Sequence, residues 1–162
     1  MKYGSVNFEK EHMARAAGIA LPISFKQSVE ICTFIRYKKV AEAKKLLQEV
    51  TEQKTAVPFR RFDFDLGHKK KIGPGRYPEK ASKEFIKLIE SAESNAQFKG
   101  MNTSNLVIAH ISANRAGKAW HYGRQSRRVM KRTSVEIFVE EKSKEDKPSK
   151  LKQQKQKSEE SK

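Results

Sequence analysis

The chain has 162 residues, with 35 Lys and Arg against 19 Asp and Glu, so its formal net charge is +16 at pH 7. Soluble domains need a net charge of only about 2–8 in magnitude, so this excess predicts a polyanionic partner, and nucleic acid fits best. The sequence contains no apolar run of the roughly 20 residues that span a bilayer, Met1–Lys10 lacks the apolar core of a signal peptide, and the single cysteine excludes an intrachain disulfide, which fits a cytosolic location.

The first predicted element is a short strand within Met13–Ile23, where small and apolar residues surround Arg15. A helix is expected next, because Ser24 and Gln27 stand three residues apart in the capping-box pattern. One face of it is predicted from residues at helical spacing: Phe25, Val29, Cys32 and Ile35 or Arg36. A cysteine on such a face is by default a buried structural thiol rather than a reactive one.

The end of this helix carries several candidate RNA-binding cations. Arg36, Lys38 and Lys39 suit the negative end of the helix dipole, and the same side chains would suit a phosphate. A second helix is expected over Val40–Glu52, with one apolar stripe made of Val40, Ala43, Leu47 and Val50. Two such helices also allow a helix–turn–helix DNA reader, although paired amphipathic helices mostly just build a core.

Residues 53–77 follow no regular period, and a loop of this length is typically functional or disordered. Basic residues interleaved with aromatic ones favour RNA, because cations contact phosphates while rings stack on bases. Alternatively, Phe59, Phe62 and Phe64 pin the loop to the core. The candidate RNA-binding residues of this loop are Arg60, Arg61, His68, Lys69, Lys70, Lys71, Arg76 and Tyr77.

A third helix is predicted to begin near Pro78, a favoured first helical position, and to stop at Gly100. Its inward stripe is Ala81, Phe85, Leu88 or Ile89, Ala92 and Ala96.

Two strands are predicted after this helix. Leu106–Ala113 is expected to place Val107, Ala109 and Ile111 on one face, with His110 either packed or in contact with RNA. The second strand is predicted from the alternation of Val135, Ile137 and Val139 with Ser134, Glu136 and Phe138.

Between these strands, Asn114–Thr133 has no core pattern and no acidic residue. As a hairpin, its arms of about ten residues would each reach roughly 30 Å. An isolated two-stranded arm is marginally stable in water and its charges repel, so we expect a folded RNA to supply the anionic surface that it needs. The alternative, a mobile basic loop without a partner, would be poor in bulky aromatic residues. The candidate RNA-binding residues here are Arg115, Lys118, Trp120, His121, Tyr122, Arg124, Arg127, Arg128, Lys131 and Arg132.

Residues 142–162 consist mostly of Lys, Glu, Ser and Gln and predict a disordered tail, which leaves 1–141 as a single domain. No metal or other cofactor is expected, because no histidine has a second His or Cys at ligand spacing. An enzyme acting on RNA is a further alternative that the His and Glu content suggests, as at Glu9, Glu11 and His12. These residues form no recognisable catalytic constellation.

Three segments resemble the large-subunit ribosomal protein twenty-two family, called seventeen in eukaryotic numbering, in its archaeal and eukaryotic form. They are Pro22–Cys32, Gly73–Pro78 and Lys131–Ile137, and the resemblance covers about Met13–Glu141. It implies an α+β fold in which three helices pack on a small three-stranded antiparallel sheet, with a long protruding β-hairpin over about 113–134. By matching position, the tunnel-lining part of the hairpin falls on Arg115–Arg132.

The same resemblance implies a structural, non-enzymatic constituent of the large ribosomal subunit that binds its ribosomal RNA and supports assembly. The implied partners are large-subunit ribosomal RNA, neighbouring ribosomal proteins, and the nascent peptide at the hairpin tip in the exit tunnel. Neither a membrane nor a homo-oligomer is expected, and the implied location is the cytoplasmic ribosome.

Overall fold

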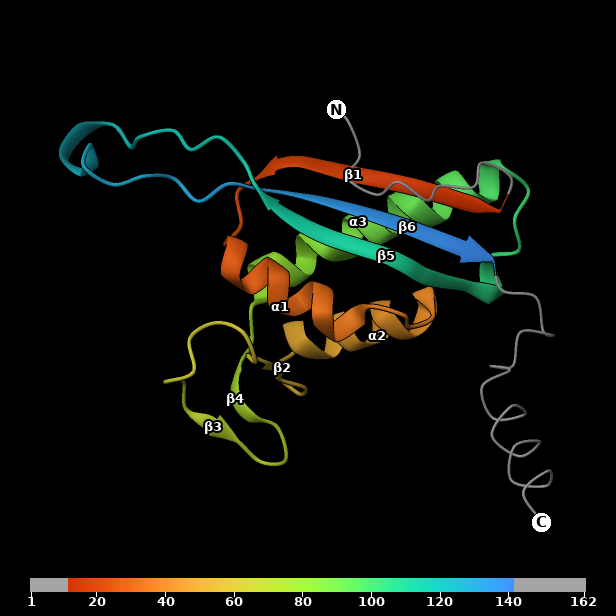
Figure 1. Ribbon diagram of the computed structural model, residues 1–162, viewed down its shortest axis with the longest axis horizontal. Helices are drawn as coiled ribbons and strands as arrows, with labels where there is room; N and C mark the ends of the chain where they lie inside the picture. The colour runs from red at the N-terminus through yellow and green to blue at the C-terminus, as the bar shows by residue number, and fades with distance from the viewer. Residues whose placement is uncertain (1–11, 142–162) are drawn as a thin grey trace, which may run out of the picture.

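The computed structural model describes residues 12–141 (Figure 1). The predicted disordered tail, and Glu9 and Glu11, lie outside the described residues. In chain order the elements are β1 (Met13–Leu21), α1 (Phe25–Ile35), α2 (Val40–Thr51), β2 (Val57–Pro58), β3 (His68–Lys69), β4 (Gly73–Arg76), α3 (Glu79–Phe98), β5 (Leu106–Arg115) and β6 (Thr133–Glu141). There are also two short 3-10 turns. The first, Thr103–Asn105, precedes β5, and the second, Gly123–Gln125, lies between β5 and β6.

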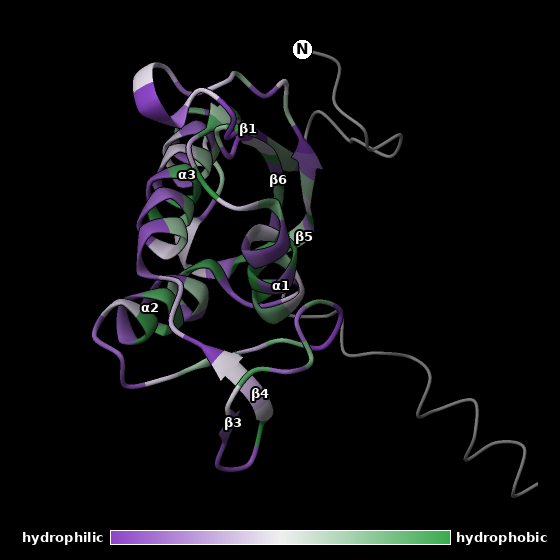
Figure 2. Cartoon of the chain, turned by 90° about the vertical axis from the view of Figure 1, so that its left-hand side faces the viewer, coloured by the Kyte–Doolittle hydropathy of each residue, from purple (hydrophilic) through white to green (hydrophobic). Residues whose placement is uncertain are grey.

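The main sheet is antiparallel, with the strand order β1-β6-β5, so the last strand lies in its centre. The helices lie together on one side of this sheet (Figure 1), and hydrophobic residues gather between the two layers (Figure 2). From β6, Val135, Ile137 and Val139 enter this core as predicted. The predicted α+β class, with three helices on a three-stranded antiparallel sheet, is confirmed.

The apolar stripes predicted for α2 and α3 are buried as expected. After α3, Gly100 adopts a φ of +78°, the left-handed conformation that glycine favours at a helix end. The predictions for α1 are only partly right, because its buried face is rotated and consists of Ser28, Glu30, Ile31, Cys32 and Ile35. Phe25 and Val29 are half-buried.

Ser24 does occupy the position before α1, but the capping-box prediction is wrong in its chemistry. Its side chain makes no capping hydrogen bond. Instead, the Ser24 carbonyl accepts hydrogen bonds from the backbone N–H and the hydroxyl of Ser28, both at 2.9 Å. The first turn of α1 contains no acidic residue either. The start of this helix is therefore electrostatically open to an anion.

The face predicted for β5 is right for Ile111 but wrong for Val107 and Ala109, because the strand contains a bulge. Its pairing with β6 shifts between Ile108 and His110. One extra residue in a strand reverses the alternation of side chains that follow it. The core therefore takes Ile108 and Ile111, and neither Val107 nor Ala109 belongs to the core cluster. His110 is packed, with its ring centroid 5.3 Å from that of Phe138.

The segment 53–77 is more ordered than the sequence indicates, because it contains a second small sheet in the order β2-β4-β3. The alternative, that the phenylalanines attach this loop to the core, is right for Phe59, which is buried, and partly right for Phe62, which is half-buried. It is wrong for Phe64, which is 65% exposed. Leu66, which the periodicity does not single out, is also buried.

Burial raises the pKa of the Cys32 thiol from 9.0 to about 12, against a smaller opposing effect of the Arg36 charge. We therefore expect iodoacetamide at pH 8 to leave Cys32 unlabelled in the folded protein and to label it fully in denaturant, because the thiolate is the nucleophile. Rapid labelling of the native protein, detected by mass spectrometry, would contradict a protonated, buried thiol.

The same raised pKa makes stability depend on pH, because the unfolded chain releases the thiol proton at a lower pH than the folded protein. The free energy of unfolding should thus fall as the pH rises above about 9 towards 12.

Candidate nucleic-acid interface

Between β5 and β6 the chain leaves the sheet as a protruding arm, residues 116–132 (cyan in Figure 1). Its two sides are joined by few backbone hydrogen bonds: Ala116 N–H to Arg132 O at 3.3 Å, Met130 N–H to Ala119 O at 2.8 Å, and His121 N–H to Arg128 O at 2.9 Å. The predicted hairpin therefore exists, but as a loosely paired arm in which Trp120 and Val129 form an isolated bridge. Like charges on both sides disfavour close pairing.

The arm exposes the side chains that the sequence analysis selected. Trp120 is 66% and Tyr122 88% exposed, while His121 is half-buried. The cations are all exposed: Lys118, Arg124, Arg127, Arg128, Lys131 and Arg132. This combination offers separate positive charges and free ring faces along one slender element, which is what a folded RNA strand can bind.

At its root, the arm is joined to the body by a series of cation–ring and ring–ring contacts. The guanidinium carbon of Arg115, at the end of β5, lies 5.0 Å from the ring centroid of Phe25 at the start of α1. Phe25 contacts Phe62 edge-on, with centroids 6.1 Å apart, and Arg61 lies 5.5 Å from the Phe62 ring. Contacts of this kind are worth about 0.5–1 kcal/mol each at exposed sites. This cation–ring series connects the arm, α1 and the loop before β3.

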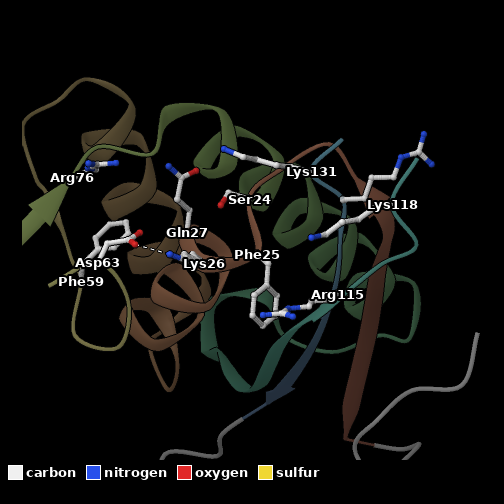
Figure 3. Close-up of a pocket in the computed structure, with 11 residues that line it drawn as sticks. Ser24, Phe25, Lys26, Gln27, Phe59, Asp63, Arg76, Arg115, Lys118 and Lys131 are labelled. Atoms are coloured by element: carbon white, nitrogen blue, oxygen red, sulfur yellow. Dashed lines mark hydrogen bonds and ion pairs between the residues drawn. The ribbon is translucent and has the colours of Figure 1, made fainter. Parts of the chain in front are cut away.

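A cavity of about 440 Å³ lies between the arm root, the start of α1 and the second sheet (Figure 3). Six cationic residues line it: Lys26, Arg76, Arg115, Lys118, Lys131 and Arg132. The lining also includes the acidic residue Asp63, which accepts a hydrogen bond from Lys26 Nζ at 2.7 Å. We call this space the root cavity.

Glu30 is a structural residue that the sequence analysis missed. It is 2% exposed, and its carboxylate accepts hydrogen bonds from the backbone N–H groups of Arg60 at 3.2 Å, Arg61 at 2.9 Å and Phe62 at 2.9 Å. It therefore fixes the turn that presents two candidate RNA-binding arginines. An acidic residue directly beside Ile31, on the inward face of α1, was the available signal.

The other predicted RNA-binding residues are distributed over several faces. Arg36 donates to the carbonyl of Ile111 at 2.9 Å, and Lys38 forms an ion pair with Glu42 at 2.9 Å. Lys69 lies 5.5 Å from the Tyr77 ring. Exposed residues elsewhere are Arg15, Lys39, Arg60, His68, Lys70 and Lys71, whereas the exposed Arg76 lines the root cavity. The structure thus brings Arg76 together with the residues of the arm root. The other predicted residues of the body come from β1, the α1–α2 turn, the loop before β3 and the β3–β4 hairpin, and they do not line the root cavity.

Within residues 12–141, no group of three or more His, Cys, Asp or Glu side chains is arranged to hold a metal ion. In the same part of the chain, no helix combines the length and apolar character needed to cross a membrane.

Residues 16–140 match the family described as Ribosomal protein L22p/L17e. The large ribosomal subunit protein uL22 of Archaeoglobus fulgidus is 42% identical over 135 residues, which cover 78% of this chain and 87% of the relative. The protein of the same name from Methanoregula boonei is 41% identical over 146 residues, covering 85% and 95%. That from Thermofilum pendens is 40% identical over 119 residues, covering 73% and 79%.

Replacing Glu30 by Gln should lower the free energy of unfolding by about 2 kcal/mol, because the change weakens three hydrogen bonds to a buried charged acceptor. Urea unfolding followed by circular dichroism measures this. Glu90→Gln, on the exposed side of α3, is the matched control and should change stability by less than about 0.5 kcal/mol. Equal effects of the two substitutions would show that the backbone contacts of Glu30 contribute little.

Proposed function

Since the chain belongs to the ribosomal protein L22p/L17e family, we propose that it binds large-subunit ribosomal RNA, supports assembly of the subunit and lines the peptide exit tunnel with its arm. Its role in the large ribosomal subunit is structural and not enzymatic. The proposal includes a location on cytoplasmic ribosomes and contacts with neighbouring ribosomal proteins.

The observation that carries the RNA-binding proposal is the arm itself. Its cations are exposed, and the sequence from Arg115 to Thr133 provides no carboxylate to neutralise them. A polyanion that releases its counterions on contact converts this repulsion into a favourable binding free energy. The exposed rings of Trp120 and Tyr122 add stacking, which is worth about 1–3 kcal/mol per base.

The exit-tunnel proposal follows from the shape of the arm. The arm extends beyond the end of the sheet, away from α2 (Figure 1), and its tip is the turn at Gly123–Gln125. A slender basic element of this kind can enter a passage with RNA walls that would exclude the body. Its outermost side chains, among them Tyr122 and Arg124, would then be the ones to meet a nascent peptide.

We propose that the second sheet and its loops make a separate RNA contact. Arg60 and Arg61 are held in place through the Glu30 carboxylate, and the β3–β4 hairpin exposes His68 and Lys70. The β3–β4 hairpin and the tip of the arm belong to different elements, so contacts through both would allow one protein to hold separate segments of a folded RNA during assembly.

Sedimentation tests the ribosomal assignment directly. The protein should travel with the large subunit on a gradient of cell lysate and remain there after a high-salt wash, because many phosphate contacts must break together. Recovery in the light fractions, or release at modest salt, would instead indicate a loosely bound factor.

The triple substitution Arg124→Gln, Arg127→Gln and Arg128→Gln should weaken binding to a large-subunit RNA transcript. The slope of log K against log salt should become less steep by roughly 0.7 for each phosphate that the variant no longer neutralises. The control removes three exposed charges from α2 and α3 through Lys45→Gln, Lys80→Gln and Lys83→Gln, and it should leave the slope nearly unchanged. An equal change in both proteins, or equal affinity for duplex DNA, would contradict a specific role of the arm.

A further inference from the structure

We propose that the root cavity binds a turn of the sugar–phosphate backbone of RNA, and that this contact fixes the direction of the arm relative to the body. The inference rests on the proposed function, because it takes the RNA as given. It adds a defined binding site away from the arm tip, and it assigns to that site the task of holding the arm in place.

The charge of the lining points to a phosphate ligand. Six cationic residues and one carboxylate surround the cavity, and that carboxylate, Asp63, is already paired with Lys26. Within residues 12–141, the ion pairs of the structure do not include Lys118, Lys131 or Arg132. Their repulsion across the cavity is relieved when an anion lies between them.

The start of α1 contributes to the same space. Ser24, Phe25, Lys26 and Gln27 line the cavity, as Figure 3 shows. The Ser24 side chain makes no capping hydrogen bond, so it does not occupy the first backbone N–H groups of this helix. Free N–H groups and the positive end of the helix dipole both favour a phosphate. The helix end thus adds to an attraction that the cationic side chains already provide.

The aromatic residues of the cavity favour backbone over base recognition. Phe25 already contacts Arg115 and Phe62, and Phe59 is 1% exposed. Arg115 thus already lies over the Phe25 ring, and the Phe59 ring is buried, which leaves little aromatic surface for base stacking. The lining therefore offers charge and N–H donors, which position a nucleic acid without reading its sequence.

The position of the cations explains the effect on the arm. Arg115 comes from the end of β5, Lys118 from the outgoing side of the arm, Lys131 and Arg132 from its returning side, and Arg76 from the second sheet. A phosphate backbone between them would be attracted to all three parts at once. Without it, the arm root is held mainly by the cation–ring series and by the loose backbone pairing described above.

Amide chemical shifts of the full-length protein provide the test, with single-stranded oligouridylate as the probe. Oligouridylate should shift the N–H signals of Phe25, Lys26 and Gln27 in the wild-type chain. The root variant Lys118→Gln, Lys131→Gln and Arg132→Gln should lose these shifts. The tip variant Arg124→Gln, Arg127→Gln and Arg128→Gln removes the same charge from the same arm and should retain them. Circular dichroism melts establish that both variants are folded.

Three results would overturn the inference. If the α1 signals do not move in the wild type, or move equally in the root variant, while the wild type still binds a large-subunit RNA transcript, the cavity is not the site and the proposed function stands. If inorganic phosphate at equal phosphate concentration and ionic strength causes the same shifts, the cavity binds a free anion. If the wild type fails to bind the transcript at all, the proposed function itself fails.

Discussion

Like-charge repulsion along the arm is the constraint on which the rest of the structure depends. Seven Lys and Arg residues stand between Asn114 and Thr133 without a carboxylate among them. Pairing between the two sides is correspondingly sparse, so the arm derives its order from its ends. Both ends continue directly into β5 and β6, and the long antiparallel pairing of these strands is one of the two pairings of the main sheet. The body thus stabilises an arm that would be only marginally stable by itself.

The contacts at the arm root orient cations without cancelling their charge. Arg115 lies on the ring of Phe25, and Arg61 lies on that of Phe62. A ring attracts a guanidinium through its quadrupole and leaves the net charge available to a further partner. A carboxylate in the same place would satisfy the cation, as Asp63 does for Lys26. The Glu30 carboxylate likewise leaves the charges of the neighbouring arginines available, because it accepts hydrogen bonds from backbone N–H groups and not from the guanidinium groups.

Periodicity predicted the elements whose burial follows a single repeat. The stripes of α2 and α3 and the alternation in β6 could be read from apolar spacing, since each element packs one continuous face on the core. The buried face of β5 could not be predicted in this way, because a bulge next to His110 changes the alternation of its side chains and the amino-acid composition gives no sign of it. The second sheet was missed because Gly73 and Pro74 have low strand propensity, and its pairing depends on residues distant in sequence. For the site, charge and aromatic content identified the arm, but the root cavity arises only when five separate segments meet.

The central position of β6 has a consequence for how the chain reaches its native state. β1, the first strand, pairs with the last one, with Met13 opposite Glu140, and β5 pairs with that same strand. During synthesis from the N-terminus, β1 and β5 therefore have no sheet partner until residues 133–141 are available. Such long-range closure slows folding relative to local helix formation. The helices can form early, but the main sheet, and with it the base of the arm, must be completed in a late step after nearly all of the described chain has been made.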